Sequence, residues 1–305
     1  MNLFCIALLA LASLSLEVAA AQTCAGTAQR DLGGVRNSWA LQGGGIAAFA
    51  KMNINFDGYG RAYHPKNFEG GALLNLCNAG KVYLPDGTSY EGSESNATCT
   101  GRFMDDFKRI GDAGWQDPAV GAINWYGIVG EGTAKVHGHT VTSVKPVLQK
   151  DGSGFYVSPT SLQDSSVDVK DQSRYVNALR VPSAVVPRSL AARGITMGTF
   201  GVAIDRRKNI SVPFVVGDGG PRIGEGSAAL ARLVAGKPLT DQVTRQTRNV
   251  GQVDTPDVLW VFFGGDAIKY NHNNEAELAS KAKEAFDKWG GDARLSECLK
   301  VVPKN

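Results

Sequence analysis

The chain is poor in histidine, in cysteine and in net charge. It holds four His and five Cys among 305 residues, and 32 basic against 29 acidic side chains leave a formal charge of +3. So small an excess does not indicate a nucleic-acid partner, which a clustered basic surface typically signals. No Cys-x-x-Cys spacing supports a zinc ribbon or a thioredoxin-like site. His137 and His139 lack a third ligand at a useful spacing, so no metal is expected.

Long hydrophobic runs are also lacking, except for one at the amino terminus. The uncharged stretch from Leu3 to Leu16 is followed by the small residues Val18-Ala19-Ala20-Ala21, which suit signal-peptidase cleavage before Gln22. The stretch is shorter than the roughly 20 apolar residues that span a bilayer. We therefore predict a signal peptide over residues 1–21 and a secreted mature chain outside the membrane, which would be extracellular, or periplasmic in a bacterium.

Removal of the signal peptide leaves an even number of cysteines. Cys5 is lost, and four remain in a chain bound for an oxidising compartment: Cys24, Cys77, Cys99 and Cys298. Three connectivities are open to two disulfides. We favour Cys77 with Cys99, which closes a short loop, and Cys24 with Cys298, which ties down both termini.

Apolar patterning predicts a mostly β fold with a few helices, of the α+β class. Residues 22–130 are rich in Gly, Asn and Asp and are expected to be irregular, whereas residues 131–305 show short β-type runs typical of a small barrel. The predicted strands are 46–55, 123–129, 140–148, 155–157, 181–186, 199–204, 212–217 and 258–263. The predicted helices are 102–110, 227–234 and 275–289, the last near the carboxyl terminus. No linker requires a division, so residues 22–305 are expected to form one domain.

Two acidic side chains border a glycine-rich loop in the barrel-like part. A β-type run delivers Asp218 into the loop Gly219-Gly220-Pro221-Arg222-Ile223-Gly224, and Glu225 follows just before a predicted helix. Glycines beside the acids let a polymer approach the backbone closely. Paired carboxylates on loops are typical of glycoside hydrolases, where one protonates the leaving oxygen and the other activates water or attacks carbon. The alternative from the residues alone is structural, since Asp in turns and Glu near helix starts are common.

The stretch around Asp218 and Glu225, together with the predicted helix that follows it and the later segment from Pro256 to Phe263, resembles the chitosanases of glycoside hydrolase family 75. A second match is Met52-Asn53-Ile54-Asn55-Phe56-Asp57-Gly58, which is similar to the family's Met-Asp-Ile-Asp-Cys-Asp-Gly. The resemblance covers roughly residues 46–270. It implies a catalytic domain in which Asp218 and Glu225 are the catalytic acids, no cofactor is needed, and the glycosidic bond is cleaved with inversion.

Two departures from the family bear on the substrate. The loop between Asp218 and Glu225 is shorter than the corresponding loop of the family. Asn53 and Asn55 stand where the family's amino-terminal motif has two of its three acids. Chitosan is a polycation, whose binding favours carboxylates in the groove. Cleavage of chitosan is therefore the first expectation, cleavage of peptidoglycan in the manner of a muramidase the second, and a catalytically inactive carbohydrate-binding relative the third.

The remaining expectations concern the roles of individual residues. Glu225 beside apolar Ile223 is expected to donate the proton, and Asp218 to act as the base. If the shortened loop draws Glu225 out of place, Asp57 is the alternative partner of Asp218. The residues expected to bind a polysaccharide substrate are Asp57, Trp125, Tyr126 and Arg222, the two aromatics by stacking on sugar faces. By analogy, the barrel is compared with the double-psi barrels of other polysaccharide-cleaving enzymes. A monomer is expected.

Overall fold

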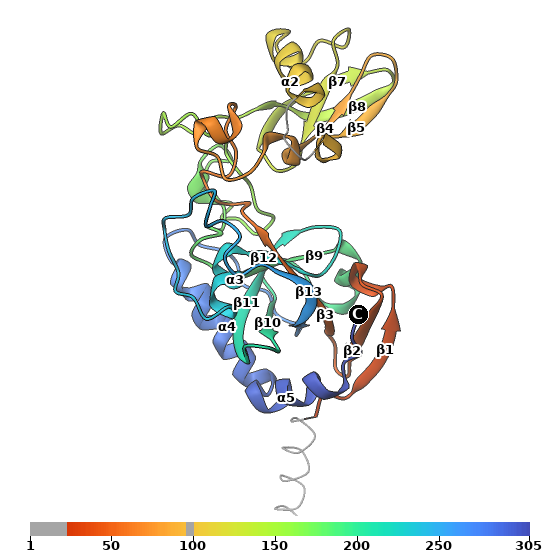
Figure 1. The fold of residues 1–305 in the computed structure, drawn as a ribbon, viewed down its shortest axis with the longest axis vertical. Coiled ribbons are helices and arrows are strands. Elements are labelled where there is room, and N and C mark those ends of the chain that lie inside the picture. Colours follow the sequence, from red (N-terminus) through yellow and green to blue (C-terminus); the bar gives the residue numbers. More distant parts are fainter. Residues whose placement is uncertain (1–22, 96–100) are drawn as a thin grey trace, which may run out of the picture.

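The computed structural model describes residues 23–95 and 101–305, which form a barrel part and a smaller part above it (Figure 1). The predicted signal peptide lies outside the described residues. The barrel part contains β1 (Gly26–Arg30), β2 (Asn37–Leu41), β3 (Ile46–Asn55), β9 (Ser183–Val186), β10 (Phe200–Asp205), β11 (Ile210–Gly219), β12 (Glu225–Ser227), β13 (Val253–Phe262) and helices α3 (Ala228–Val234), α4 (Glu275–Trp289) and α5 (Gly291–Val301). The smaller part contains β4 (Gly80–Tyr83), β5 (Ser89–Glu91), β6 (Ala122–Trp125), β7 (Gly130–Val136), β8 (His139–Pro146) and helix α2 (Arg102–Asp112). Short 3-10 helices cover Leu32–Gly34, Asn67–Gly70, Leu76–Ala79, Gly92–Ser95, Gln172–Arg174 and Arg188–Arg193.

Six strands close into a barrel in the order β3-β12-β9-β11-β10-β13, because β3 pairs with both β12 and β13. The pairs β3–β12 and β9–β11 are parallel, and the others are antiparallel. Strands β1 and β2 continue the sheet from β3. The closed barrel confirms the predicted mostly β, α+β fold with a small barrel, while the comparison with double-psi barrels stays a prediction.

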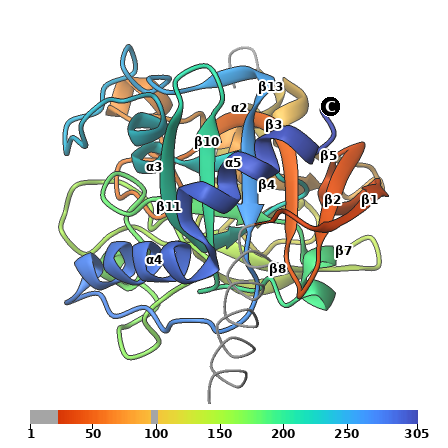
Figure 2. The same ribbon diagram turned by 90° about the horizontal axis from the view of Figure 1, so that it is seen from below.

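Alternation along β3 separates the barrel interior from its outer layer. Ile46 and Ala48 point into the interior with Trp260 and Phe262 of β13, and all four are fully buried. Ala47 and Phe49, which alternate with them, pack outward in a second cluster that includes residues of α4 and α5. These two helices cover one side of the barrel (Figure 2). The first half of β3 is thus buried on both faces, and its last three residues, which are half-buried, pair with β12.

The expected boundary at residue 130 does not coincide with the sheets. Strands β1 to β3 come from the stretch predicted to be irregular and yet belong to the barrel, whereas β7 and β8 lie beyond residue 130 and form a separate two-stranded sheet. Barrel closure joins strands far apart in the chain, which local composition does not reveal. The predicted helices are confirmed by α2, α3 and α4, and α5 was not predicted.

One predicted disulfide is confirmed. Cys24 is bonded to Cys298, with their Cα atoms 5.0 Å apart, and joins the start of the barrel part to α5. Cys77 is buried and also disulfide-bonded. Its expected partner, Cys99, lies outside the described residues. Across residues 23–95 and 101–305, no helix has the length and apolar character needed to cross a bilayer.

Candidate active site

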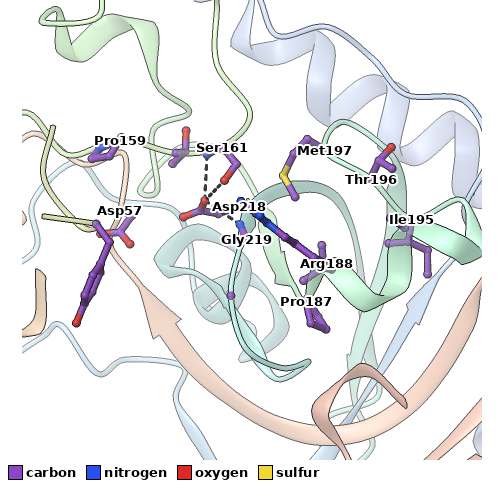
Figure 3. Close-up of a pocket in the computed structure, with 15 residues that line it drawn as sticks. Asp57, Pro159, Ser161, Pro187, Arg188, Ile195, Thr196, Met197, Asp218 and Gly219 are labelled. Atoms are coloured by element: carbon purple, nitrogen blue, oxygen red, sulfur yellow. Dashed lines mark hydrogen bonds between the residues drawn. The ribbon is translucent and has the colours of Figure 1, made fainter. Parts of the chain in front are cut away.

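An open cleft of about 1030 Å³ lies where the smaller part meets the barrel (Figure 3). One wall comes from the ends of the segments that join the two parts, and the opposite wall comes from barrel loops. The cleft is lined by Asp57, Tyr126, Pro159, Thr160, Ser161, Val186, Pro187, Arg188, Ala191, Ile195, Thr196, Met197, Asp218, Gly219 and Gly220. Two of the sequence-predicted acids, Asp57 and Asp218, therefore share one cavity.

Asp218 is positioned by an irregularity near the end of β11. The register of β11 against β9 shifts between Val216 and Asp218, and such a bulge turns the following side chain away from the regular alternation. One carboxylate oxygen, Oδ1, accepts hydrogen bonds from the Ser161 N–H at 3.0 Å, the Ser161 hydroxyl at 2.6 Å and the Gly219 N–H at 2.8 Å. Burial raises the pKa of Asp218, and these donors oppose that rise because they stabilise the anion.

Asp57 follows β3 and faces the same cleft. Its Oδ1 accepts hydrogen bonds from the Tyr63 hydroxyl at 3.2 Å and the Ser158 hydroxyl at 3.4 Å, both longer than the bonds to Asp218. Burial, reinforced by the charges of Asp218 and Glu225, raises the pKa of Asp57 well above its ordinary value. Gly58 permits the turn after it, because its φ is +86° and a Cβ there would lie 1.9 Å from the Val176 carbonyl oxygen.

Asn55 links these two acids. Its side-chain oxygen accepts the Asp57 N–H at 2.5 Å, and its side chain also hydrogen-bonds to the Asp218 carboxylate. In the motif that Met52 to Gly58 resembles, an acid stands at this position. An amide donates a hydrogen bond where an acid would add a further negative charge, so Asn55 lets Asp57 and Asp218 lie close together.

Glu225 begins β12, which pairs in parallel with β3 so that Glu225 lies opposite Asn53. Ser227, two residues on, caps α3 by accepting the Leu230 N–H at 3.2 Å. Burial and the charge of Asp218 raise the pKa of Glu225, and the charge of Arg222 lowers it. Glu225 thus belongs to the same electrostatic cluster as Asp57 and Asp218, although it is absent from the described cleft lining.

The two aromatic neighbours Trp125 and Tyr126 have opposite environments. Tyr126 lines the cleft and is 51% exposed, as a sugar-stacking residue requires. Trp125 is only 3% exposed, and its indole N–H donates to the Val144 carbonyl at 3.0 Å. The expectation that Trp125 binds substrate is therefore wrong: as the last residue of β6 it faces the core of the smaller part, and the next residue faces outward.

Several residues of the site carried no usable signal in the sequence. Ser161, Ser158 and Tyr63 hold the two aspartates but stand in unremarkable loop sequence, and Arg188 enters the cleft from a short 3-10 helix. Arg222, which was predicted to bind substrate, lines a separate hollow on the other side of the glycine-rich loop. In the part of the chain that the structure describes, no three His, Cys, Asp or Glu side chains are grouped so that they could hold a metal ion.

Comparison with known proteins adds no relative to this picture. No family model matches the chain, and no curated protein is significantly similar to it. The chemistry of the site must therefore be inferred from its own residues.

Proposed function

We propose that this protein is a secreted glycoside hydrolase that cleaves a β-1,4-linked amino-sugar polymer within the chain, as an inverting two-carboxylate enzyme. The observation that carries the proposal is the pair of partly buried aspartates, Asp57 and Asp218, in one open cleft. Their surroundings push the two carboxyl groups toward different protonation states, which is the requirement for acid and base catalysis at one site.

Asp218 is the base in this proposal. Its oxygen accepts three short hydrogen bonds from Ser161 and Gly219, which favour the ionised form. An ionised carboxylate that lines a cleft is able to orient a water molecule and remove its proton as the water attacks the anomeric carbon. Asp218 was also the residue that the sequence resemblance implied for catalysis.

Asp57 is the proton donor in this proposal. It receives fewer and longer hydrogen bonds than Asp218, and burial together with two neighbouring acids raises its pKa, so Asp57 is the acid that this proposal takes as protonated. A protonated carboxyl in the cleft is able to protonate the leaving glycosidic oxygen. Glu225, which was expected to donate the proton because it stands beside apolar Ile223, acts in this proposal through its charge, which raises the pKa of Asp57.

The cleft itself fits a polymeric substrate. It is open along its length at the junction of the two parts, and the exposed Tyr126 offers a ring face to a sugar. The Cys24–Cys298 disulfide is compatible with the exported state that the amino-terminal sequence predicts. An open cleft supports cleavage within a chain.

The test is direct incubation of the purified mature protein with chitosan oligomers and, separately, with cell-wall sacculi. Release of shorter saccharides supports the proposal, and ¹H NMR within minutes of cleavage reads the product anomer. An initial α-anomer from a β-linked substrate supports inversion, and an initial β-anomer refutes it. Intact polymers after long incubation, together with measurable binding, favour the alternative of an inactive carbohydrate-binding protein.

A further inference from the structure

Arg188 is the basic residue of the cleft. It lies at the start of a short 3-10 helix, its side chain is exposed, and Figure 3 shows it extending toward the loop at Gly219. Within residues 23–95 and 101–305, it forms no ion pair with a carboxylate. This unpaired guanidinium lines the same cleft as Asp218 and is therefore available to a ligand there.

A second hollow of about 260 Å³ lies across the glycine-rich loop from the cleft. The loop contributes Gly219 and Gly220 to the cleft and Arg222, Ile223 and Gly224 to this hollow. The charged side chains that line the hollow are all basic in the described part of the chain: Arg36, Lys51 and Arg222. Basic side chains are thus present both in the cleft and in the hollow.

Acidic side chains that would receive a polycation are scarce at the same surfaces. Among the described residues that line the cleft, the carboxyl groups are those of Asp57 and Asp218, and the proposed mechanism leaves one negative charge between them. Glu91, beside the cleft residue Tyr126, is ion-paired with Lys81 at 3.2 Å. An ammonium group on each sugar of a bound chain would meet Arg188 at one position and would find a single ionised cleft carboxylate for all the others.

We propose that the cleft takes a β-linked glycan that carries carboxylate groups, and that Arg188 binds one of those carboxylates next to the scissile bond. The inference rests on the proposed function, which places the chain across Asp57 and Asp218. A planar guanidinium donates two parallel hydrogen bonds to a carboxylate, so it selects this group over a neutral hydroxymethyl or an ammonium. Two sources share this chemistry: the lactyl carboxylates of peptidoglycan strands, which are the amino-sugar polymer of the proposed function, and the ring carboxylates of polyuronates, which contain no amino sugar and would replace that polymer class.

The experiment measures binding rather than turnover, in the Asp218→Asn background so that ligands stay intact. Four oligosaccharides of equal length are titrated by calorimetry: a peptide-free peptidoglycan strand, the same strand with its carboxylates reduced to alcohols, a polyuronate oligomer and a chitosan oligomer. Arg188→Gln removes the positive charge. Arg188→Lys keeps the charge but lacks the planar guanidinium that donates two parallel hydrogen bonds. Lys208→Gln is the matched control. Lys208 is exposed in the turn before β11, about 30 Å along the strand from Asp218.

The proposal expects one of the two carboxylated ligands to bind about tenfold more tightly than the chitosan oligomer, and that ligand identifies the source. If it is the peptidoglycan strand, the carboxyl-reduced strand binds correspondingly less. Arg188→Gln should weaken binding of the preferred ligand about three- to tenfold, Arg188→Lys less, and Lys208→Gln not at all. Added salt should weaken binding of the parent and leave the Arg188→Gln variant less affected.

Tighter binding of chitosan, or unchanged affinity in Arg188→Gln with a native melting curve, overturns the inference. These outcomes differ from failure of the proposed function, which is read separately with the unmutated protein. Carboxylated glycan that binds through Arg188 but is never cleaved refutes hydrolysis and keeps the inference. Efficient cleavage of chitosan together with an unaffected Arg188→Gln variant refutes the inference and keeps hydrolysis. Absence of binding to all four ligands refutes the inference, and the incubation of the unmutated protein with polymer then decides on hydrolysis.

Discussion

Ser161 donates both its backbone N–H and its hydroxyl to the same oxygen of Asp218, at 3.0 and 2.6 Å. Ser161 stands in the segment that returns from the smaller part to the barrel, and the next residue, Leu162, donates its N–H to the Gly217 carbonyl at 2.8 Å. The segment that joins the two parts is therefore hydrogen-bonded to the end of β11 at Asp218, the residue proposed to activate water. Any displacement of this segment would change the ionisation of Asp218 as well as the width of the cleft.

Ser161→Ala removes the shorter of these hydrogen bonds and tests the role of Asp218 as base. Because the hydroxyl stabilises the ionised carboxylate, its loss should raise the pKa of Asp218 and move the acid limb of the pH–rate profile to higher pH, by up to about one unit. Activity at neutral pH should fall several-fold.

The matched control is Ser166→Ala, because Ser166 makes the same pair of contacts to Asp164 outside the cleft, at 3.0 and 2.6 Å. That variant should keep the pH profile of the parent. An unmoved acid limb in Ser161→Ala would mean that Asp218 is not the group whose ionisation limits the reaction.

The surroundings of Asp218 could largely be predicted from the sequence because they are local. An apolar strand, a glycine-rich loop and a serine cap before an Ala/Leu helix follow one another within the stretch 214–234, and the structure has them in that order. Each step depends on neighbours in the chain, so propensity and capping are sufficient guides.

The rest of the site depends on contacts between distant segments. Asp57 approaches Asp218 because β3 pairs with β12 in a closed barrel, and no local pattern encodes that pairing. Ser161 and Arg188 enter the cleft for the same reason, from segments without a motif. The prediction for Trp125 was wrong because the sequence does not distinguish a buried aromatic from an exposed one. Trp125 faces the core and Tyr126 faces outward because β6 ends at Trp125.

Glu225→Gln separates the charge role of Glu225 from that of a proton donor. The negative charge of Glu225 raises the pKa of Asp57, so its removal should lower that pKa and shift the basic limb of the pH–rate profile to lower pH while activity is retained. Asp57→Asn and Asp218→Asn should each reduce activity by about 10²- to 10⁴-fold. Initial rates of the three variants and the parent, measured from pH 4 to 9, test these expectations. An inactive Glu225→Gln beside an active Asp57→Asn would return the donor role to Glu225.

Asp57→Asn should also stabilise the protein at neutral pH. The pKa of Asp57 is raised in the folded state, so its stabilising contribution is present below the unfolded-state pKa of about 3.9 and is lost as pH rises through the folded-state value. Asn is neutral throughout and avoids that loss. The Tm difference between variant and parent should therefore grow from near zero at pH 4 to a few degrees at pH 8.

Asp164→Asn should change the stability of the protein at neutral pH in the opposite direction. Hydrogen bonds from Ser166 and His272 lower the pKa of Asp164, so its contribution is present above the unfolded-state pKa, and the variant should be less stable at neutral pH. Parallel melts of both variants across pH 4 to 8 make the measurement. A Tm difference for Asp57→Asn that does not depend on pH would show that Asp57 is ionised at no cost in the folded protein.

Tyr126 and Trp125 offer a contrast between adjacent rings, one in the cleft and one in the core. Tyr126→Ala should raise KM about three- to tenfold with little change in kcat or Tm, because a half-exposed ring contributes to sugar stacking rather than to the core. Tyr126→Phe keeps the ring and should keep KM. Trp125→Ala should instead lower Tm sharply, since it empties a buried site at a cost of about 3–5 kcal/mol. If KM is unchanged in Tyr126→Ala while the cleft acids remain essential, the substrate passes the acids without contacting Tyr126.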